Sequence, residues 1–507
     1  MHLDAWTAAY DSPGASAAHL LCDRHDPGAV AFTFVGADLT SHDVTYGELA
    51  ERSRRLATVL AGLGVREGDR VPVLMGKRPE LVVTLLAILR LGAVHVPLFT
   101  AFATGAIRMR VEGSRARLVV TEPSQRAKLD PIEGIEVLET GDAFDGLVDA
   151  AEPLATSVAA GGDGTMLQLF TSGTTGKPKG VPVPVRALAS FHCYLHYGLD
   201  VREDDVFWNA ADPGWAYGLY YGVLGPLAAG RRNLLLDAGF TPESTVAVLD
   251  RFGVTNFAGA PTMYRALAKS GLVPSARLRR ASSAGEPLTP EVVEWARGAL
   301  GTEVRDHYGQ TELGMVINNH WHPDAARPVK PGSMGQPMPG YAAGIVDGQI
   351  AIDVENSPLL WFTGYHDDPE KTADRFTADK RWYLTADSGR LDDDGYFFFT
   401  ARNDDVILAA GYRIGPFDVE SVLITHPAVA DVAVVGRPDP EGIRGEVVEA
   451  FVVLTEETQA SDDLAAELQR LVRDNYSKHA YPRTVHFVDA LPKTPSGKIQ
   501  RYLLRQR

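Results

Sequence analysis

The sequence predicts an α/β protein: a large N-terminal domain of helix-covered sheets that ends in a small barrel, followed by a small α+β C-terminal domain. The first observation is a pair of short apolar runs, residues 71–75 and 94–98, on either side of a stretch, 79–92, in which leucine and valine recur at helical spacing. A strand, a helix and a strand in this order form a parallel sheet that helices cover. The second observation is that residues 332–400 contain short β segments and turns but few helical runs, which indicates the small barrel.

Further elements of the N-terminal part have clear local signals. A helix is expected from residue 45 to 63, because Leu49, Leu56 and Leu60 keep helical spacing and Gly64 follows as a stop signal. Elsewhere, strands are indicated by short runs between turn residues. These runs are apolar, alternate between apolar and polar residues, or are rich in β-branched residues. These strands are expected at residues 118–121, 166–170, 181–185, 254–261 and 281–284.

The C-terminal part has its own alternation of elements. Residues 419–426 and 460–477 have the pattern of helices. Strands are expected at residues 429–436, 447–454 and 485–488. This order predicts a compact α+β domain.

Composition limits the kinds of partner. The chain has 507 residues and a net charge of −16 without a long basic run, which argues against nucleic acid as a partner. Its two cysteines, Cys22 and Cys193, show no metal-binding spacing and no disulfide framework, as expected for a cytoplasmic protein. The start of the sequence lacks the pattern of a signal peptide, and the longest apolar stretch, near residues 81–91, is too short to span a membrane.

Residues 169–180, Leu-Phe-Thr-Ser-Gly-Thr-Thr-Gly-Lys-Pro-Lys-Gly, concentrate hydroxyls, glycines and lysines as no other stretch does. Glycines let backbone N–H groups approach a ligand, hydroxyls donate further bonds and lysines add charge, which together suit a polyphosphate. The loop is not a Walker P-loop, because Pro178 follows Lys177 where that motif has a hydroxyl residue. A polar surface hairpin is the simpler alternative. The predicted phosphate-binding residues are Thr171, Ser172, Gly173, Thr174, Thr175 and Lys179.

This loop resembles the phosphate-binding signature of the adenylate-forming, or AMP-binding, superfamily, which includes acyl-CoA synthetases and aryl-CoA ligases. Residues 305–312 contain the family's Tyr-Gly-x-Thr-Glu pattern, and residues 491–501 contain its Pro-Lys-Thr-x-x-Gly-Lys order. Each stretch alone has a simpler interpretation, an ordinary loop and a disordered basic tail. The resemblance covers nearly the whole chain and is closest to the medium-chain acyl-CoA synthetase branch. It implies an enzyme that uses ATP and Mg²⁺ to convert a carboxylic acid into an acyl-adenylate, and then transfers the acyl group to CoA.

The resemblance also implies roles for individual residues. Tyr308 would offer a face to the adenine, Thr311 a hydroxyl to the α-phosphate, and Glu312 an oxygen ligand to Mg²⁺. Asp387 would accept hydrogen bonds from the ribose hydroxyls. Lys498 matches the catalytic lysine and would act with Thr311 and Glu312. The ATP-binding residues implied outside the phosphate loop are Gly285, Glu286, Pro287, Asp306, His307, Tyr308, Gln310, Thr311, Asp387 and Arg402.

Asp404 falls where the family has its interdomain hinge, which divides the chain into residues 1–403 and a mobile domain, 404–507. The family implies that this domain turns between the two half-reactions. The residues expected to contact CoA are Gly411, Tyr412, Arg413 and, by weaker alignment, Arg473. The alternative for Arg473 is the solvated face of a helix.

The acyl pocket is expected around Trp215, Ala216, Tyr217, Ala284 and Gly309. Dedicated acetyl-CoA synthetases have a tryptophan where this chain has Gly309, so a deeper pocket and a medium-chain or branched acid are expected, although the large Tyr217 works against depth. The alternatives are a ligase that loads a carrier protein and an aryl-CoA ligase. A nucleotide-binding protein without catalysis would be expected to lack Lys498, Lys179 or Glu312, and all are present. The family also allows a homodimer.

Overall fold

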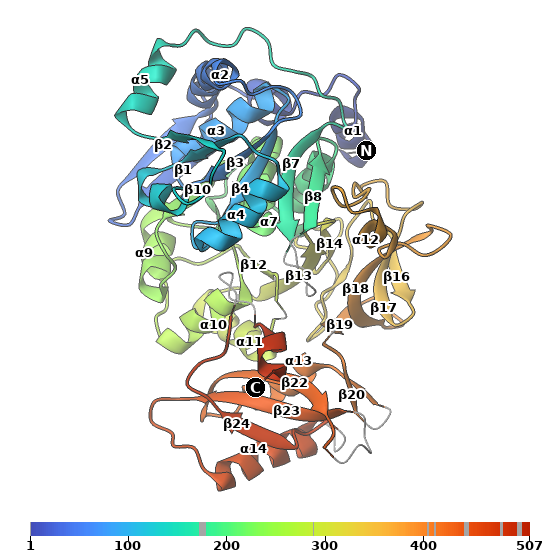
Figure 1. The fold of residues 1–507 in the computed structure, drawn as a ribbon. Coiled ribbons are helices and arrows are strands. Elements are labelled where there is room, and N and C mark those ends of the chain that lie inside the picture. The colour runs from blue at the N-terminus through green and yellow to red at the C-terminus, as the bar shows by residue number, and fades with distance from the viewer. Residues whose placement is uncertain are drawn as a thin grey trace.

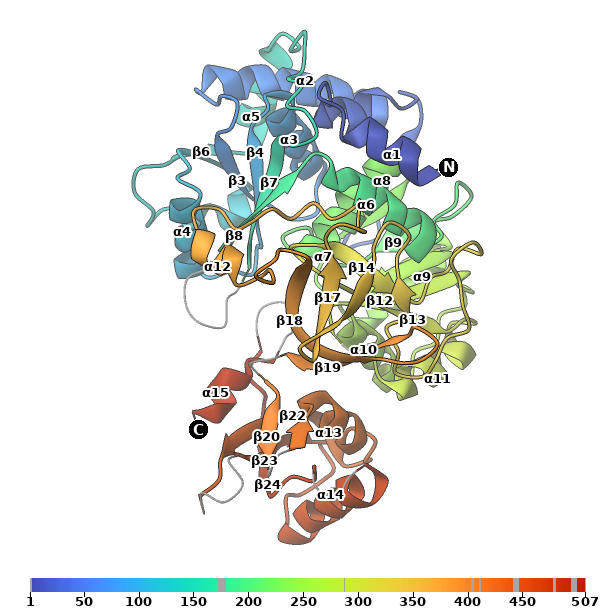
Figure 2. The same cartoon turned by 90° about the vertical axis from the view of Figure 1, so that its right-hand side faces the viewer.

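The computed structural model describes residues 2–171, 179–286, 288–402, 405–409, 412–440, 446–476, 480–493 and 499–506. A large N-terminal part and a smaller C-terminal part are visible in Figure 1, and the C-terminal part lies at the end of the molecule to which β19 leads. Figure 2 shows the same arrangement from the side. The predicted α/β class with a small C-terminal α+β unit is confirmed.

One sheet of the N-terminal part has the strand order β6-β5-β3-β4-β7-β8. Its neighbouring strands run parallel from β6 to β7, and β8 runs antiparallel to β7. The strands are β3 (Arg70–Leu74), β4 (Val94–Leu98), β5 (Leu118–Thr121), β6 (Glu136–Glu139), β7 (Thr165–Thr171) and β8 (Lys179–Pro184). The predicted strand–helix–strand unit is therefore β3, α3 (Pro79–Arg90) and β4.

The predicted first long helix is α2 (Tyr46–Gly62). Its start is fixed by a capping box, in which the Thr45 side chain accepts from the backbone N–H of Glu48 and the Glu48 carboxylate accepts from the N–H of Thr45. Together α2 and α3 pack at the end of the molecule opposite to the C-terminal part (Figure 1). The other helices of this first part of the chain are α1 (His2–Tyr10), α4 (Thr104–Gly113) and α5 (Asp142–Ala150).

The second sheet has the order β15-β14-β13-β12-β11-β9-β10-β1-β2. Its strands are β1 (Val30–Gly36), β2 (Ser41–Thr45), β9 (Phe207–Asn209), β10 (Asn233–Asp237), β11 (Asn256–Gly259), β12 (Arg280–Ala284), β13 (Val304–Gln310), β14 (Gly314–Asn318) and β15 (Gln336–Pro337). The Tyr-Gly-Gln motif, expected after a strand, lies within β13, because β14 pairs with it and continues the hydrogen-bond ladder past Tyr308. The large apolar core includes Leu85, Leu167 and Phe191, and joins both sheets.

Several helices surround the second sheet. They are α6 (Ala187–Cys193), α7 (Ala216–Gly218), α8 (Gly225–Ala229), α9 (Pro242–Phe252), α10 (Pro261–Ser270) and α11 (Pro290–Ala299). Single turns of 3₁₀ or π type complete this part: η1 (His19–Asp23), η2 (Pro123–Lys128), η3 (Tyr194–Gly198) and η4 (Leu219–Leu224). Across the described ranges, the structure has no helix of the length and apolarity that a membrane crossing requires.

Residues 332–400, for which the sequence predicts a small barrel, contain an antiparallel sheet with the order β16-β17-β18-β19. The elements of this region are β16 (Ala343–Val346), β17 (Gln349–Asp353), α12 (Pro369–Ala373), β18 (Trp382–Leu391) and β19 (Phe397–Arg402). The hairpin between β16 and β17 turns at Asp347 and Gly348, which both have positive φ, as a tight hairpin turn requires. A bridge between Gly335 and Phe397 joins this sheet to the second large one.

The C-terminal part has the predicted α+β order. Its elements are β20 (Ile407–Ala409), β21 (Tyr412–Ile414), α13 (Pro416–Leu423), β22 (Val429–Pro438), β23 (Glu446–Leu454), α14 (Asp462–Asn475), β24 (Thr484–Phe487) and α15 (Arg501–Arg505). The sheet β22-β23-β24 packs on α13 and α14 through Val434, Val452 and Leu468, which are fully buried. Each predicted helix and strand of this part is confirmed within a few residues.

Candidate active site

The predicted phosphate loop joins two paired strands. Thr171 ends β7 and pairs with Lys179, the first residue of β8. This is the strand–loop–strand setting that the sequence predicts. The predicted ligands Ser172, Gly173, Thr174 and Thr175 lie outside the described residues.

Glu312 follows β13 and is 6% exposed. Its Oε1 accepts a hydrogen bond of 2.7 Å from the Tyr365 hydroxyl, and Nε of Arg375 donates to the Tyr365 oxygen at 2.8 Å. The Lys179 ammonium lies 4.9 Å from the centre of the Tyr365 ring. Lys179 and the predicted metal ligand therefore both contact one tyrosine.

A magnesium ion fits this arrangement. Mg²⁺ is usually held by one or two carboxylates together with substrate phosphates and water, so a single buried carboxylate suits it. The bond from Tyr365 uses one lone pair of Oε1 of Glu312, and the carboxylate has further lone pairs for a cation. In the described part of the chain, no group of three or more His, Cys, Asp or Glu residues is placed to hold a metal.

The predicted nucleotide residues meet at Asp387 in β18. Its Oδ2 accepts hydrogen bonds of 2.6 Å from the Tyr308 hydroxyl and 2.6 Å from Nε2 of Gln310. In the sheet register, Asp387 lies opposite Arg402, the other residue predicted to contact the ribose. The preceding Ala386 has a φ of 61°, an unfavourable value for alanine and of the kind that clusters at functional sites.

His307 of β13 belongs to a chain of hydrogen bonds with Tyr194 and Tyr217. Burial lowers the pKa of His307 to about 3, so the ring is neutral. Its Nε2 lies 3.2 Å from the Asn319 carbonyl oxygen, which only accepts, so Nε2 carries the hydrogen and Nδ1 accepts from the Tyr194 hydroxyl at 2.7 Å. The Tyr194 oxygen then accepts from Tyr217 at 3.1 Å. Both ring nitrogens of the predicted nucleotide residue His307 are thus bonded within the protein, and Tyr217 is held in place by the same chain.

The other residues predicted near the nucleotide surround the end of β12. Gly285 has a φ of 97°, which glycine adopts readily, and it follows the buried Ala284. The Glu286 carboxylate accepts from the Thr262 hydroxyl and from Arg265, each at 2.9 Å. Pro287 lies outside the described residues.

Asp306 lies in β13, opposite Ser283 of β12. Burial raises the pKa of its carboxyl group to about 8. Its backbone carbonyl accepts from the side-chain amide of Asn319 at 3.0 Å. A carboxyl group with a shifted pKa of this kind is common at functional sites.

Trp215 and its neighbours are divided between two environments. The Trp215 ring packs against Phe99 and Phe102, with centroid distances of 5.4 Å and 5.2 Å. Tyr217, two residues later, belongs instead to the tyrosine cluster, 5.4 Å from the Tyr221 ring. Ala216 begins α7 between them.

Glycine at position 309 does not by itself open the acyl pocket. A Cβ atom at Gly309 would lie 2.1 Å from the carbonyl oxygen of Gly314 and 2.7 Å from Cα of Met315. The backbone of β14 fills the space that a side chain at this position would need. The pairing of β13 with β14 shifts its register between Tyr308 and Gly309. The glycine is therefore required by the close approach of two strands, whatever acid the enzyme takes.

Gly309→Ala is expected to lower the free energy of unfolding by about 1–3 kcal/mol, because the added Cβ atom would clash with the backbone of β14. Thermal unfolding without ligands measures this loss. Gly298→Ala in α11 is the control, since nothing lies within 4 Å of its added Cβ and alanine favours a helix. Equal unfolding temperatures for Gly309→Ala and the parent protein would contradict the close approach.

The predicted CoA and hinge residues are only partly described. Arg473 lies in α14, is paired with its neighbour Asp474 at 2.8 Å between Nε and Oδ1, and has a side chain that is 46% exposed, as on a solvated helix face. Tyr412 and Arg413 belong to β21, where their backbones pair with β20. The predicted residues Asp404, Gly411 and Lys498 lie outside the described residues.

The described residues around Lys498 are fixed to the C-terminal part. Lys493 and Ile499 form an antiparallel bridge. Lys493 pairs with Asp431 at 2.6 Å, and Arg501 donates to both oxygens of Glu420. Close to the first pair, Lys269 of α10 donates to the Ala430 carbonyl, which ties the two parts of the molecule together.

Sequence reasoning missed three residues of this region: Tyr365, Arg375 and Tyr194. None of the three belongs to a motif that the sequence analysis identified. Tyr365 contacts Glu312 and Tyr194 contacts His307, each more than 50 positions away, whereas Arg375 is linked to Glu312 through Tyr365.

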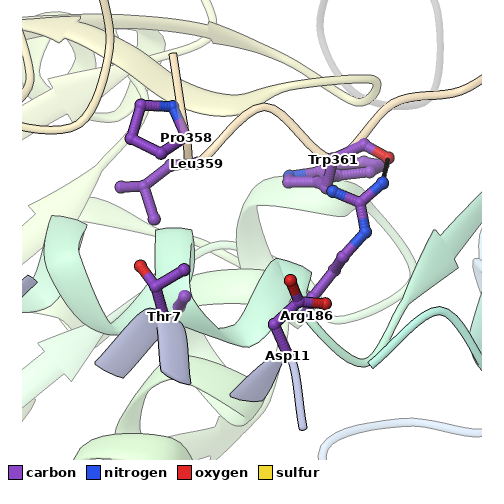
Figure 3. Close-up of a pocket in the computed structure, with 7 residues that line it drawn as sticks. Thr7, Asp11, Arg186, Pro358, Leu359 and Trp361 are labelled. Atoms are coloured by element: carbon purple, nitrogen blue, oxygen red, sulfur yellow. Dashed lines mark hydrogen bonds between the residues drawn. The ribbon is translucent and has the colours of Figure 1, made fainter. Parts of the chain in front are cut away.

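A small pocket lies elsewhere, between α1, the start of α6 and residues 358–361 (Figure 3). Arg186 crosses it, donating to the Trp361 carbonyl at 3.2 Å and to Asp163 at 3.0 Å. The lining residues are Thr7, Asp11, Arg186, Ala189, Pro358, Leu359 and Trp361, and none of them is a predicted site residue.

The chain is similar to several known proteins. The family described as AMP-binding enzyme matches residues 22–356, and the AMP-binding enzyme C-terminal domain matches residues 418–498. An acetyl-coenzyme A synthetase of Bacillus subtilis (strain 168) is 37% identical over 492 residues, which are 91% of this chain and 84% of that protein. The mitochondrial acyl-coenzyme A synthetase ACSM3 of Homo sapiens is 36% identical over 515 residues, 95% of this chain and 86% of that protein. A crystal structure of an acyl-CoA synthetase from Brucella canis is 44% identical, with a TM-score of 0.77, and the match covers 99% of this chain and 96% of that one.

The chain therefore belongs to the AMP-binding enzyme family, and the predicted resemblance to the adenylate-forming superfamily is confirmed. Within this family it is an acyl-CoA synthetase, an AMP-forming ligase that joins a carboxylic acid to CoA. ATP, CoA and a carboxylic acid are the substrates of this class. The enzyme class predicted from the sequence is thereby confirmed.

Proposed function

We propose that this enzyme activates a carboxylic acid longer than acetate, and that the residues gathered around Glu312 and Asp387 bind its ATP. The observation that carries the proposal is the convergence of groups from distant segments: Lys179 from β8, Glu312 after β13 and Asp387 from β18. These groups are linked by Tyr365, Tyr308 and Gln310. A cation for the phosphates, a ligand for the metal ion and an acceptor for the ribose hydroxyls are the groups that ATP binding requires.

In the first half-reaction, a carboxylate oxygen of the acid attacks the α-phosphorus of ATP, and the bond from that phosphorus to pyrophosphate breaks. Catalysis is then mostly alignment and charge stabilisation. Lys179 and the hydroxyl of Thr171, with the loop between them, would hold the β- and γ-phosphates. Thr311 would bind the α-phosphate, and Glu312 would hold Mg²⁺, whose charge offsets that of the phosphates.

In the second half-reaction, the CoA thiol attacks the acyl carbonyl carbon, the bond to AMP breaks, and the thiol proton is released. The C-terminal domain, residues 404–507, would turn about Asp404 between the half-reactions. Lys498 would then leave the site and Gly411–Arg413 would guide CoA. Cytoplasmic location and a homodimer remain predictions.

The acid itself would contact the segment around Trp215 and the end of β12. Ala216 and Ala284 have small side chains, whereas the Tyr217 ring is held in one place through Tyr194 and His307. The pocket wall on that side would therefore be rigid. The named relatives include both an acetyl- and an acyl-coenzyme A synthetase at similar identity, so the identity values do not choose between short and longer acids.

Pyrophosphate release with a panel of acids is expected to show kcat/KM at least about tenfold higher for the best longer acid than for acetate. Two additional buried methylenes contribute about 1.6 kcal/mol, which corresponds to about that factor. The panel contains straight-chain, branched and aromatic acids. Preference for acetate over every longer acid would contradict the proposal, and preference for an aromatic acid would favour an aryl-CoA ligase.

The acceptor is tested with the acid that the panel selects. Free CoA is expected to be converted to the acyl thioester. Transfer to the pantetheine arm of a carrier protein, without transfer to free CoA, would instead identify the carrier-loading alternative.

A further inference from the structure

We infer that Arg375 and Tyr365 are positioning residues that orient Glu312 for its metal and hold Lys179 beside it. The Arg375–Tyr365–Glu312 relay consists of the bond from Nε of Arg375 to the Tyr365 oxygen, 2.8 Å, and the bond from the Tyr365 hydroxyl to Oε1 of Glu312, 2.7 Å. The inference rests on the proposed function, because it takes Glu312 to be the magnesium ligand.

The direction of the relay is fixed by chemistry. A guanidinium group only donates hydrogen bonds, and an ionised carboxylate only accepts them. The Tyr365 oxygen therefore accepts from Arg375, and its single hydrogen points to Glu312.

The two side chains that form the second bond of the relay are buried. Tyr365 and Glu312 are each 6% exposed, so neither side chain exchanges this bond for one to bulk water. Burial by itself lowers the pKa of Arg375, but the facing Tyr383, Tyr365 and Glu312 raise it overall. The relay thus begins at the guanidinium charge of Arg375 and ends at the Glu312 carboxylate.

The relay also connects the metal side of the site to the ribose side. Nη1 of Arg375 donates to the Thr385 carbonyl at 3.1 Å, and Nε2 of Gln310 donates to the same carbonyl at 2.9 Å. Gln310 continues to Asp387. One arginine therefore fixes the strand that carries Asp387 and, through Tyr365, the carboxylate of Glu312.

The Tyr365 ring has a second function in this arrangement. The Lys179 ammonium lies 4.9 Å from the ring centre, within the range of an attractive cation–π contact. Burial, and then the charge of Arg375, lower the pKa of Lys179, whereas Glu312 raises it. Removing only the hydroxyl of Tyr365 separates the two functions, because a phenylalanine ring keeps the contact with Lys179.

Tyr365→Phe is expected to raise about 10- to 100-fold the Mg²⁺ concentration that half-saturates binding of a non-hydrolysable ATP analogue, because groups that orient a metal ligand typically contribute this much. Calorimetric titration of the analogue at several Mg²⁺ concentrations measures the shift without any turnover. In activity assays, the same variant is expected to need more Mg²⁺ while KM for the acid stays close to that of the parent enzyme.

Tyr396→Phe is the matched control. Tyr396 is 5% exposed, donates to the Pro328 carbonyl at 2.6 Å, and has the Lys330 ammonium 4.6 Å from its ring centre, yet its hydroxyl bond does not lead to Glu312. It is expected to lose a similar amount of stability without changing the Mg²⁺ requirement. Arg375→Lys keeps the charge but loses the fixed Nε geometry, so it is expected to shift the requirement in the same direction, and it carries the test if Tyr365→Phe does not fold.

Glu312→Gln distinguishes failure of the relay from failure of the proposed function. If Glu312→Gln raises the Mg²⁺ requirement and neither Tyr365→Phe nor Arg375→Lys does, the relay is wrong and the metal ligand stands. If Glu312→Gln leaves the requirement unchanged, the metal ligand itself is wrong, and the relay falls with it. A uniform rise of KM for ATP, acid and CoA in Tyr365→Phe, without a specific Mg²⁺ shift, would reduce Tyr365 to a structural residue and overturn the inference.

Discussion

Lys498→Ala is expected to slow acyl-adenylate formation by ~10²–10³-fold and to leave thioester formation from a supplied acyl-adenylate nearly unchanged. The loss of a fixed cation that stabilises charge only in the transition state lowers kcat. Lys498 is expected to be such a cation, between the acid carboxylate and the α-phosphate. The two half-reactions are measured separately: pyrophosphate release for the first, and CoA-dependent release of AMP from synthetic acyl-adenylate for the second.

The surrounding tail makes the test specific to one lysine. Lys493 and Ile499 are joined by a bridge, and both Lys493 and Arg501 are paired with acids of the C-terminal part. Lys493→Ala therefore removes a cation from the same tail, but one that is already paired with Asp431, and it is expected to keep most of the adenylation rate. Equal losses of both half-reactions in Lys498→Ala would show that the lysine is not specific to the first.

Glu312→Gln is expected to lower kcat/KM for ATP by ~10²–10³-fold in the first half-reaction, because the amide keeps the shape but loses the negative charge that a hard cation needs. The Tyr365 hydroxyl can still donate to the amide oxygen, so the fold around residue 312 is expected to persist. Initial rates of pyrophosphate release at varied ATP and Mg²⁺ concentrations, together with thermal unfolding, measure the two effects separately.

Glu303→Gln serves as the control for a lost carboxylate. Glu303 precedes β13 at the end opposite to Glu312 and accepts from Nε of Arg305 at 3.0 Å. We expect it to affect stability slightly and kcat/KM for ATP hardly at all, since partly exposed ion pairs contribute little. An unchanged kcat/KM in Glu312→Gln would remove Glu312 from the site.

Much of the fold could be predicted because its signals are local. The unit β3–α3–β4 follows from the spacing of leucine and valine, and the strands on both sides of the phosphate loop follow from short apolar runs. The extent of β13 could not be predicted in this way. Its last residues, Tyr308 to Gln310, become a strand because β14 pairs with them, and this partner is not visible in the local sequence.

The residues of the candidate site could likewise be predicted only in part. Tyr308, Gln310, Glu312 and Asp387 could be found because their motifs are contiguous, and the structure brings Tyr308 and Gln310 to within hydrogen-bond distance of Asp387. The sequence also marks His307 as a nucleotide residue, but it does not show that both ring nitrogens are bonded to Tyr194 and Asn319. A motif gives the type of residue, whereas the hydrogen-bond partners depend on which strands and helices meet.

By itself, the sequence determined the family, the order of the elements and the class of reaction, because these depend on patterns that adjacent residues carry. Only the tertiary structure decided that Gly309 is needed for the approach of β14, that Tyr217 is held through Tyr194, and that Arg375 reaches Glu312 through Tyr365. The physical reason is that steric fit and the direction of a hydrogen bond are set by atoms from segments far apart in the chain. Those atoms come together only after the sheets have formed and packed.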